Sequence, residues 1–127
     1  LMVEELSQGK TVINQPAGHL EPNESLIEAV IREVLEETAY LTRPEAIIGL
    51  YQHPSQSADI LYFRICFLCR VIEKTNHPLD PDIQAALWLP VEQIEERPHR
   101  SPLVRRCLSD YLAGQRFPLT LYQEILA

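Results

Sequence analysis

Arg32, Glu33, Glu36 and Glu37 crowd one short stretch of the sequence, "REVLEE". Carboxylates three and four residues apart share one side of a helix, where like charges repel each other. A helical projection at about 100° per residue places Glu37 at the edge of the apolar face, so at least one carboxylate must lie against packed side chains. Burying neighbouring carboxylates is unfavourable unless they are protonated or meet a cation.

A hard divalent cation resolves this conflict, because a single arginine cannot neutralise three glutamates. Magnesium prefers oxygen ligands, keeps several waters and is usually held by few carboxylates together with substrate phosphates. The stretch therefore predicts a magnesium site that acts on a phosphate compound. Two alternatives remain open from these residues: a solvated acidic helix face, and an interaction domain stabilised by structural calcium.

The composition limits the kind of partner. A chain of 127 residues with 46% hydrophobic residues predicts one globular domain spanning 1–127. The net charge of −7 argues against a nucleic-acid polymer or an anionic membrane as partner. No apolar run reaches the roughly 18 residues of a membrane span. Cys66 and Cys69 point to opposite faces of a predicted strand, so we expect ordinary core cysteines and a reducing, cytoplasmic location.

The elements that would position the glutamates alternate between strands and helices. Strands are predicted at 1–6, 11–15, 46–52, 60–72 and 84–90, and helices at 26–38, 91–96 and 102–113. Ser25 and Glu28 form a capping-box pattern at the start of the acidic helix. The predicted fold class is α/β, with a mixed β-sheet sandwiched between helices. The chain opens directly on a strand pattern, "LMVEEL", with no initiator methionine, so we expect residues upstream.

The residues before and within the acidic helix match a longer pattern, G-x5-E-x7-R-E-U-x-E-E-x-G-U, in which U is apolar. The matching residues are Gly18, Glu24, Arg32, Glu33, Val34, Glu36, Glu37 and Tyr40. The chain thereby resembles the Nudix hydrolase family. The segments "NQPAGHLEP", "RSPLV" and "GQRFPL" resemble one phosphatase subgroup of that family, so the likeness covers nearly the whole chain. Members of that subgroup normally have one more strand before "LMVEE", so the resemblance implies a first strand outside the given sequence. The departure is Ala39, where the family usually has glycine, and we expect a slightly different helix exit there.

The resemblance implies a Nudix fold and hydrolysis of a phosphoanhydride bond with Mg²⁺, or with Mn²⁺. The implied substrates are nucleoside di- or triphosphates, or related pyrimidine- and thiamine-type pyrophosphates. ADP-ribose or another nucleoside-diphosphate derivative is the competing substrate, and a non-catalytic nucleotide-binding module is the competing function. We expect the protein to be either a monomer or a homodimer.

Carried over residue by residue, the resemblance makes Glu33, Glu36 and Glu37 metal ligands, with the Gly18 carbonyl as a further candidate. Glu33 is alternatively the base that takes the proton of the attacking water. Arg32 is expected to pair with Glu24 and to hold the geometry of loop and helix.

Residues outside this pattern must supply the rest of the site. We predict Asp82 as general base, with Asp80 as its alternative, although both could simply shape a turn around Pro81. Aromatic rings can stack on a base, and guanidinium groups can bind a phosphate with two hydrogen bonds. The substrate-binding candidates on these grounds are Tyr51, His53, Tyr62, Arg64, Arg100 and Arg116. For Arg100 and Arg116, a structural capping role is the alternative.

Overall fold

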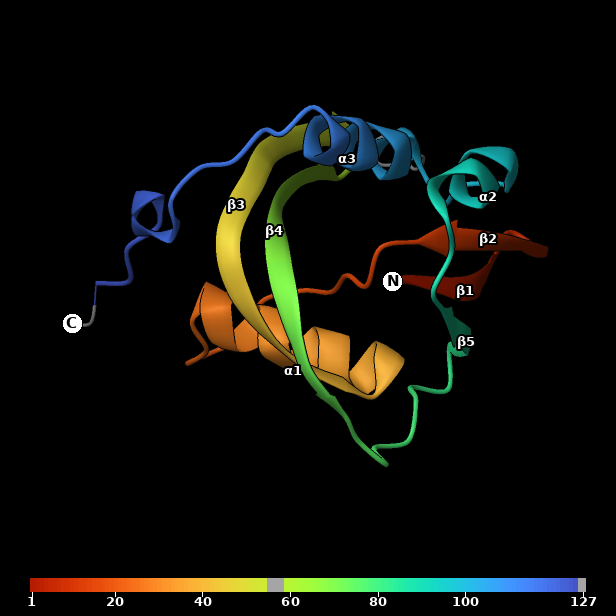
Figure 1. The fold of residues 1–127 in the computed structure, drawn as a ribbon, viewed down its shortest axis with the longest axis horizontal. Helices are drawn as coiled ribbons and strands as arrows, with labels where there is room; N and C mark the ends of the chain where they lie inside the picture. The colour runs from red at the N-terminus through yellow and green to blue at the C-terminus, as the bar shows by residue number, and fades with distance from the viewer. Residues whose placement is uncertain (55–58, 126–127) are drawn as a thin grey trace.

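The computed structural model describes residues 1–54 and 59–125 (Figure 1). Its elements, in order, are β1 (Met2–Ser7), β2 (Lys10–Asn14), α1 (Leu26–Thr38), β3 (Tyr40–Pro54), β4 (Leu61–Lys74), β5 (Ile83–Leu87), α2 (Val91–Glu96), α3 (Pro102–Leu112) and a 3₁₀ turn at Leu119–Leu121. All the predicted helices and strands are present. The largest difference is β3, which begins six residues earlier than the predicted strand at 46–52. Among the helices so described, none is long and apolar enough to cross a membrane.

The α/β class is confirmed, but the prediction of one mixed sheet is wrong for the described strands. They form a three-stranded sheet in the order β2-β1-β5 and a separate pair, β3-β4, and every strand pairing is antiparallel. The parallel contact in this part of the chain is an isolated bridge between Ile13 and His99. Antiparallel neighbours need only a tight turn, as at Gln8-Gly9 with φ of 53° and 78°, whereas parallel neighbours need a long crossover.

The β3-β4 pair forms a long curved arch with α1 on one side and α3 on the other (Figure 1). Both helices pack against β3. The register shifts at three places along the pair, and such bulges bend and twist a strand. Leu61 and Phe63, on the predicted apolar face of β4, are more than half exposed, because in the described residues β4 has no sheet neighbour beyond β3.

The three-stranded sheet packs against α2 and α3. Met2 of β1, Ile13 of β2, Ile94 of α2 and Val104 of α3 form a buried cluster. Full burial of aliphatic side chains of this size contributes about 1.5–3 kcal/mol each. This cluster fixes α3 relative to the three-stranded sheet. Because α3 also packs against β3, and because β2 leads into residues 15–25 before α1, the cluster also fixes the arch relative to that segment.

Helix α1 begins at the predicted cap. The Ser25 hydroxyl accepts a hydrogen bond from the Glu28 N–H at 3.0 Å, and the Glu28 carboxylate accepts one from the Ser25 N–H at 3.2 Å. The helix ends at Ala39, whose φ of 65° is left-handed. The backbone N–H of Ala39 donates to the Leu35 carbonyl at 2.9 Å. The expected change in helix exit is therefore not found: alanine adopts the left-handed C-cap conformation that glycine favours.

We expect Ala39→Gly to raise the free energy of unfolding by up to about 1 kcal/mol, because glycine adopts positive φ without the strain that a Cβ causes. Ala29→Gly is the matched control, since Ala29 is equally buried, at 7% exposure, but lies in the interior of the same helix. That control should lose about 1 kcal/mol. Urea denaturation of both variants measures the difference. A loss of stability at both positions would show that Ala39 carries no backbone strain.

Candidate active site

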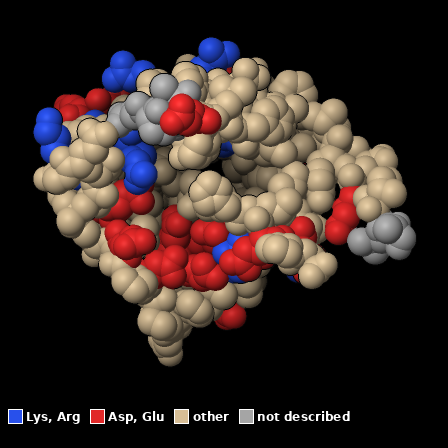
Figure 2. All heavy atoms as spheres, turned by 180° about the vertical axis from the view of Figure 1, so that it is seen from behind, with Lys and Arg blue, Asp and Glu red and all other residues tan. Residues whose placement is uncertain are grey.

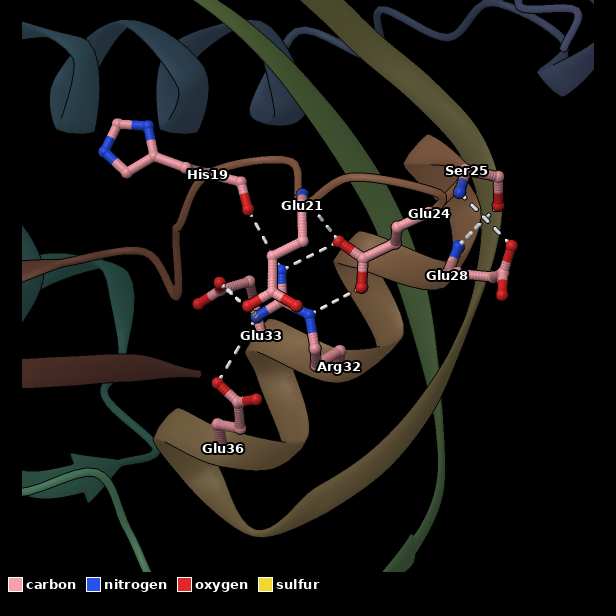
Figure 3. A network of polar contacts seen from close by, with 8 residues as sticks. All are labelled: His19, Glu21, Glu24, Ser25, Glu28, Arg32, Glu33 and Glu36. Atoms are coloured by element: carbon pink, nitrogen blue, oxygen red, sulfur yellow. Dashed lines mark hydrogen bonds and ion pairs between the residues drawn. The ribbon is translucent and has the colours of Figure 1, made fainter.

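Arg32 organises the acidic side of α1 (Figure 3). Its Nε donates to Glu24 Oε2 at 2.6 Å, and its Nη2 donates to Glu24 Oε1 at 2.9 Å. The predicted pairing of Arg32 with Glu24 is thereby confirmed as a two-point contact. Nη2 also donates to the carbonyl oxygen of His19 at 3.0 Å. One guanidinium thus ties the helix to the loop that precedes it.

The other terminal nitrogen of Arg32 faces two of the predicted metal ligands. Nη1 lies 2.6 Å from Glu33 Oε1 and 3.4 Å from Glu36 Oε2. The hydrogen bond to Glu24 is the main reason that the pKa of Arg32 is raised, and the same bond lowers the pKa of Glu24. Arg32 is therefore charged at every physiological pH. With Glu21 Oε1 at 3.5 Å, three carboxylates lie close to its Nη1.

Glu37 is held apart from Arg32. Its side chain lies on the packed side of the helix, as its position in the helical projection predicts, and the residue is 9% exposed. It accepts a hydrogen bond from the Ala17 N–H at 3.0 Å. Burial, together with the nearby carboxylates of Glu33, Glu5 and Asp80, raises the pKa of Glu37 to about 8, although the hydrogen bond from the Ala17 N–H acts in the opposite direction. A buried acid surrounded by negative charge is stable at neutral pH only when it is protonated or meets a cation.

Gly18 lies directly against the Glu33 carboxylate. A Cβ at this position would overlap the carboxyl carbon and both oxygens of Glu33. A side chain at position 18 would therefore displace the Glu33 carboxylate from its present place, and the Gly18 backbone borders the predicted metal ligands.

The chemistry of these groups fits a hard divalent cation. All the donors are oxygens, two of the carboxylates already face one positive charge, and the third, Glu37, has no cationic partner in the described part of the chain. In the described residues, no three His, Cys, Asp or Glu side chains are spaced as a complete ligand set. Glu33 and Glu36 would therefore have to turn from Arg32 toward Glu37 to share an ion with it.

The loop that precedes β5 brings Asp80 to this helix. The Asp80 N–H donates to the Glu36 carbonyl at 2.9 Å, and the Asp80 carboxylate contributes to the raised pKa of Glu37. Asp82, the predicted base, is exposed and, within residues 1–54 and 59–125, makes no hydrogen bond to the glutamates. The two aspartates are separated only by Pro81, and which of them faces the helix depends on the turn.

Glu5 of β1 joins the acidic group, although the sequence analysis did not select it. It receives hydrogen bonds from Asn14 at 3.4 Å and from Arg100 at 2.9 Å, and its charge acts on Glu37. No local signal marked Glu5, because it comes from a strand distant in the sequence. Figure 2 shows the resulting gathering of Asp and Glu side chains along one wall of a hollow.

The predicted substrate residues of the arch divide into two groups. Tyr51 donates to Asp110 of α3 at 2.7 Å, and burial raises its pKa, so its hydroxyl holds α3 to β3. His53 and Tyr62 are paired across β3 and β4. Arg64 donates to the Gln15 side chain at 3.4 Å, which brings β4 next to the segment that leads to Gly18. Of these four, Tyr62 and Arg64 approach the loop of the acidic helix.

The two C-terminal candidates, Arg100 and Arg116, both make contacts within the protein. Arg116 donates to the carbonyls of Tyr111 and Gln115 at 3.2 and 2.8 Å and lies over the Tyr111 ring, so its contacts match the capping alternative. Arg100 contacts Glu5. It also borders an open cavity of about 610 Å³ along α3, lined by His99, Arg100, Ser101, Pro102, Arg105, Arg106 and Ser109. None of the α1 glutamates lines that cavity.

Comparison with known proteins places this site within a family. The family model described as "NUDIX domain" matches residues 1–107, so the chain belongs to the Nudix family. It is a Nudix hydrolase, a class whose members act on small phosphoanhydride substrates and typically depend on a divalent metal.

The similarity between this chain and its relatives extends over most of its length. The "Phosphatase NudJ" of Escherichia coli (strain K12) is 39% identical over 123 residues, which covers 95% of this chain and 80% of that protein. The protein of the same name in Shigella flexneri matches equally well. Among solved structures, a "NUDIX hydrolase from Nitrosomonas europaea" aligns with a TM-score of 0.92 and 41% identity, covering 98% of this chain and 86% of that one. The E. coli ORF135 protein aligns with a TM-score of 0.61 at 18% identity, over 88% of this chain and 78% of that one, and shows the shared fold.

Proposed function

We propose that this chain hydrolyses a phosphoanhydride bond in a nucleoside di- or triphosphate, or in a related pyrimidine- or thiamine-type pyrophosphate, with Mg²⁺ as its metal and Mn²⁺ as a substitute. The supporting observation is Glu37, a buried acid with raised pKa beside Glu33, Glu5 and Asp80. A divalent cation would neutralise the negative charge of such a site and would in turn attract the phosphates of a substrate. The phosphatase name of its relatives supports the same choice of chemistry.

Glu33, Glu36 and Glu37 would hold the metal, with the Gly18 carbonyl as a further ligand. When bound, the metal would neutralise phosphate oxygens and lower the pKa of a bound water enough for attack near pH 7. Arg32 and Glu24 are positioning residues, since they fix the loop relative to the helix through hydrogen bonds of 2.6 and 2.9 Å.

For the general base we propose Asp80 in preference to Asp82, because the backbone of Asp80 is tied to Glu36 and its charge acts on Glu37. Its carboxylate would accept the proton of the attacking water. Glu33 is the alternative candidate for the general base. A cytoplasmic location and the oligomeric state stay predictions from the sequence.

A panel of substrates tests the function: CTP, CDP, ADP, thiamine pyrophosphate and ADP-ribose, each with Mg²⁺ and with excess EDTA. Released phosphate and pyrophosphate are measured separately, so that the bond cleaved is identified. We expect turnover of di- and triphosphates that EDTA abolishes. Turnover of ADP-ribose alone would favour the nucleoside-diphosphate-derivative alternative. Tight binding without any product would identify a binding module, and undiminished activity in EDTA would refute the metal mechanism.

A further inference from the structure

Two exposed aromatic rings face each other beside the acidic site. The ring of His19, in the loop that follows Gly18, lies 6.4 Å from the ring of Tyr62 on β4, centroid to centroid. The two ring planes are inclined by 33°. Tyr62 is 41% exposed, and His19 is exposed as well, so neither ring is needed to fill the core.

The position of His19 is set by the acidic helix. Its carbonyl oxygen accepts the 3.0 Å hydrogen bond from Arg32, and the preceding Gly18 lies against Glu33. In Figure 3 the His19 carbonyl points toward Arg32, while the imidazole ring points away from the carboxylates. The ring is thus held at a fixed place next to the predicted metal ligands, without taking part in their network.

Tyr62 is brought to the opposite side by β4. Residues two apart on a strand share one face, so Tyr62 and Arg64 lie on the same side of β4. Arg64 contacts Gln15 at 3.4 Å, so this face of β4 runs alongside the 15–19 segment. The two rings therefore come from different elements, the loop and the arch, and lie near each other beside the segment that leads into α1.

We propose that His19 and Tyr62 form an aromatic clamp that holds the planar ring of the substrate between them. A ring contacts an aromatic face at about 3.5 Å, so two faces that enclose it stand about 7 Å apart. The observed 6.4 Å is slightly shorter than that spacing and the ring planes are inclined by 33°, so the two exposed side chains would turn slightly apart to admit the substrate ring. This inference rests on the proposed function and narrows it: the preferred substrates carry a base or pyrimidine ring on one side of the phosphoanhydride.

The clamp explains how such a substrate is oriented. With its ring between His19 and Tyr62, its phosphates extend past Gly18 toward the glutamates of α1. The guanidinium of Arg64, on the face shared with Tyr62, lies on the same side and can donate to a phosphate oxygen. His19 is a residue that sequence reasoning missed. Its signal is its position directly after the glycine that starts the pattern.

The test compares a ring-bearing with a ring-free phosphoanhydride, CDP and inorganic tripolyphosphate. In His19→Ala and Tyr62→Leu, we expect the ratio of kcat/KM for CDP to that for tripolyphosphate to fall about 10-fold, mainly through the KM for CDP, as base stacking on aromatic residues implies. His19→Phe and Tyr62→Phe keep an aromatic face and should restore most of this ratio.

Matched controls lie elsewhere on the surface. Tyr111→Leu removes a tyrosine of α3 that is also 41% exposed, and His77→Ala removes an exposed histidine. Neither should change the ratio. Calorimetric titration with CDP measures binding directly, and His19→Ala and Tyr62→Leu should each weaken it about 10-fold.

The outcomes separate the clamp from the proposed function. Weaker CDP binding in both clamp variants, without turnover in the wild type, would refute the hydrolase function and support the clamp. Normal turnover with unchanged CDP binding and an unchanged ratio in both variants would overturn the clamp and leave the function standing. A wild type that binds no CDP would overturn the clamp, and so would phenylalanine variants that behave like Ala and Leu variants.

Discussion

Glu37→Gln is expected to lower kcat by about 10²–10³-fold while the protein stays folded. Glutamine keeps the shape of the side chain and can still accept the hydrogen bond from the Ala17 N–H, but it removes the negative charge that would hold a cation. Loss of one electrostatic contact that stabilises the transition state typically has an effect of this size. Steady-state hydrolysis of the best substrate in Mg²⁺ measures it.

Glu95→Gln serves as the matched control, because Glu95 is an exposed glutamate of α2, away from the site, and should keep wild-type kcat. Circular dichroism of both variants checks that the fold is retained. Full activity of Glu37→Gln would contradict the assignment of Glu37 as a metal ligand.

The same substitution should change how stability depends on pH when metal is absent. The pKa of Glu37 rises from 4.5 to about 8 in the folded protein. Between these values the unfolded chain has lost the proton that the folded state retains, so the contribution of Glu37 is complete below about pH 4.5 and is lost as pH rises toward 8. We therefore expect Glu37→Gln to match the wild type near pH 4.5 and to exceed it by a few kcal/mol near pH 8.

Urea denaturation at several pH values in EDTA measures this difference. Added Mg²⁺ should raise the stability of the wild type at pH 8 and have little effect on Glu37→Gln, because ligand binding stabilises only a folded state that contains the site. A constant difference between wild type and variant at all pH values would contradict the burial of a titrating Glu37.

Arg32→Lys is expected to lower kcat/KM by about 10- to 100-fold, since positioning residues next to metal ligands have effects of this size. Lysine keeps the charge but cannot reproduce the two-point contact with Glu24 together with the bonds to His19 and Glu33. Because the Arg32 side chain is 21% exposed, the loss of stability should stay near 1–3 kcal/mol.

Arg106→Lys is the control for a guanidinium in an ion pair. Arg106 contacts Asp110 at 3.0 Å, but its side chain is 68% exposed, so the free energy of unfolding should stay close to that of the wild type. Glu24→Gln should reproduce the loss of activity seen in Arg32→Lys, and combining the two should add little, since they remove one shared contact. Wild-type kinetics in Arg32→Lys would refute a positioning role.

The sequence by itself determined the local features of the site. The helix 26–38 was predictable from its capping box and its apolar spacing, and both depend on interactions within a few residues. The burial of Glu37 followed from the same spacing. The contact between Arg32 and Glu24 was indicated by the resemblance to the family pattern, and the geometry confirms it.

The tertiary structure decided what the distant elements contribute. Asp80 rather than Asp82 reaches the helix because of a turn, Glu5 arrives on a strand from the start of the chain, and Tyr51 is held by α3. The arrangement of the strands as two antiparallel sheets was likewise decided by which strands pair. Contacts between residues far apart in sequence depend on how sheets and helices pack, and a single sequence carries no local periodicity that reports this packing.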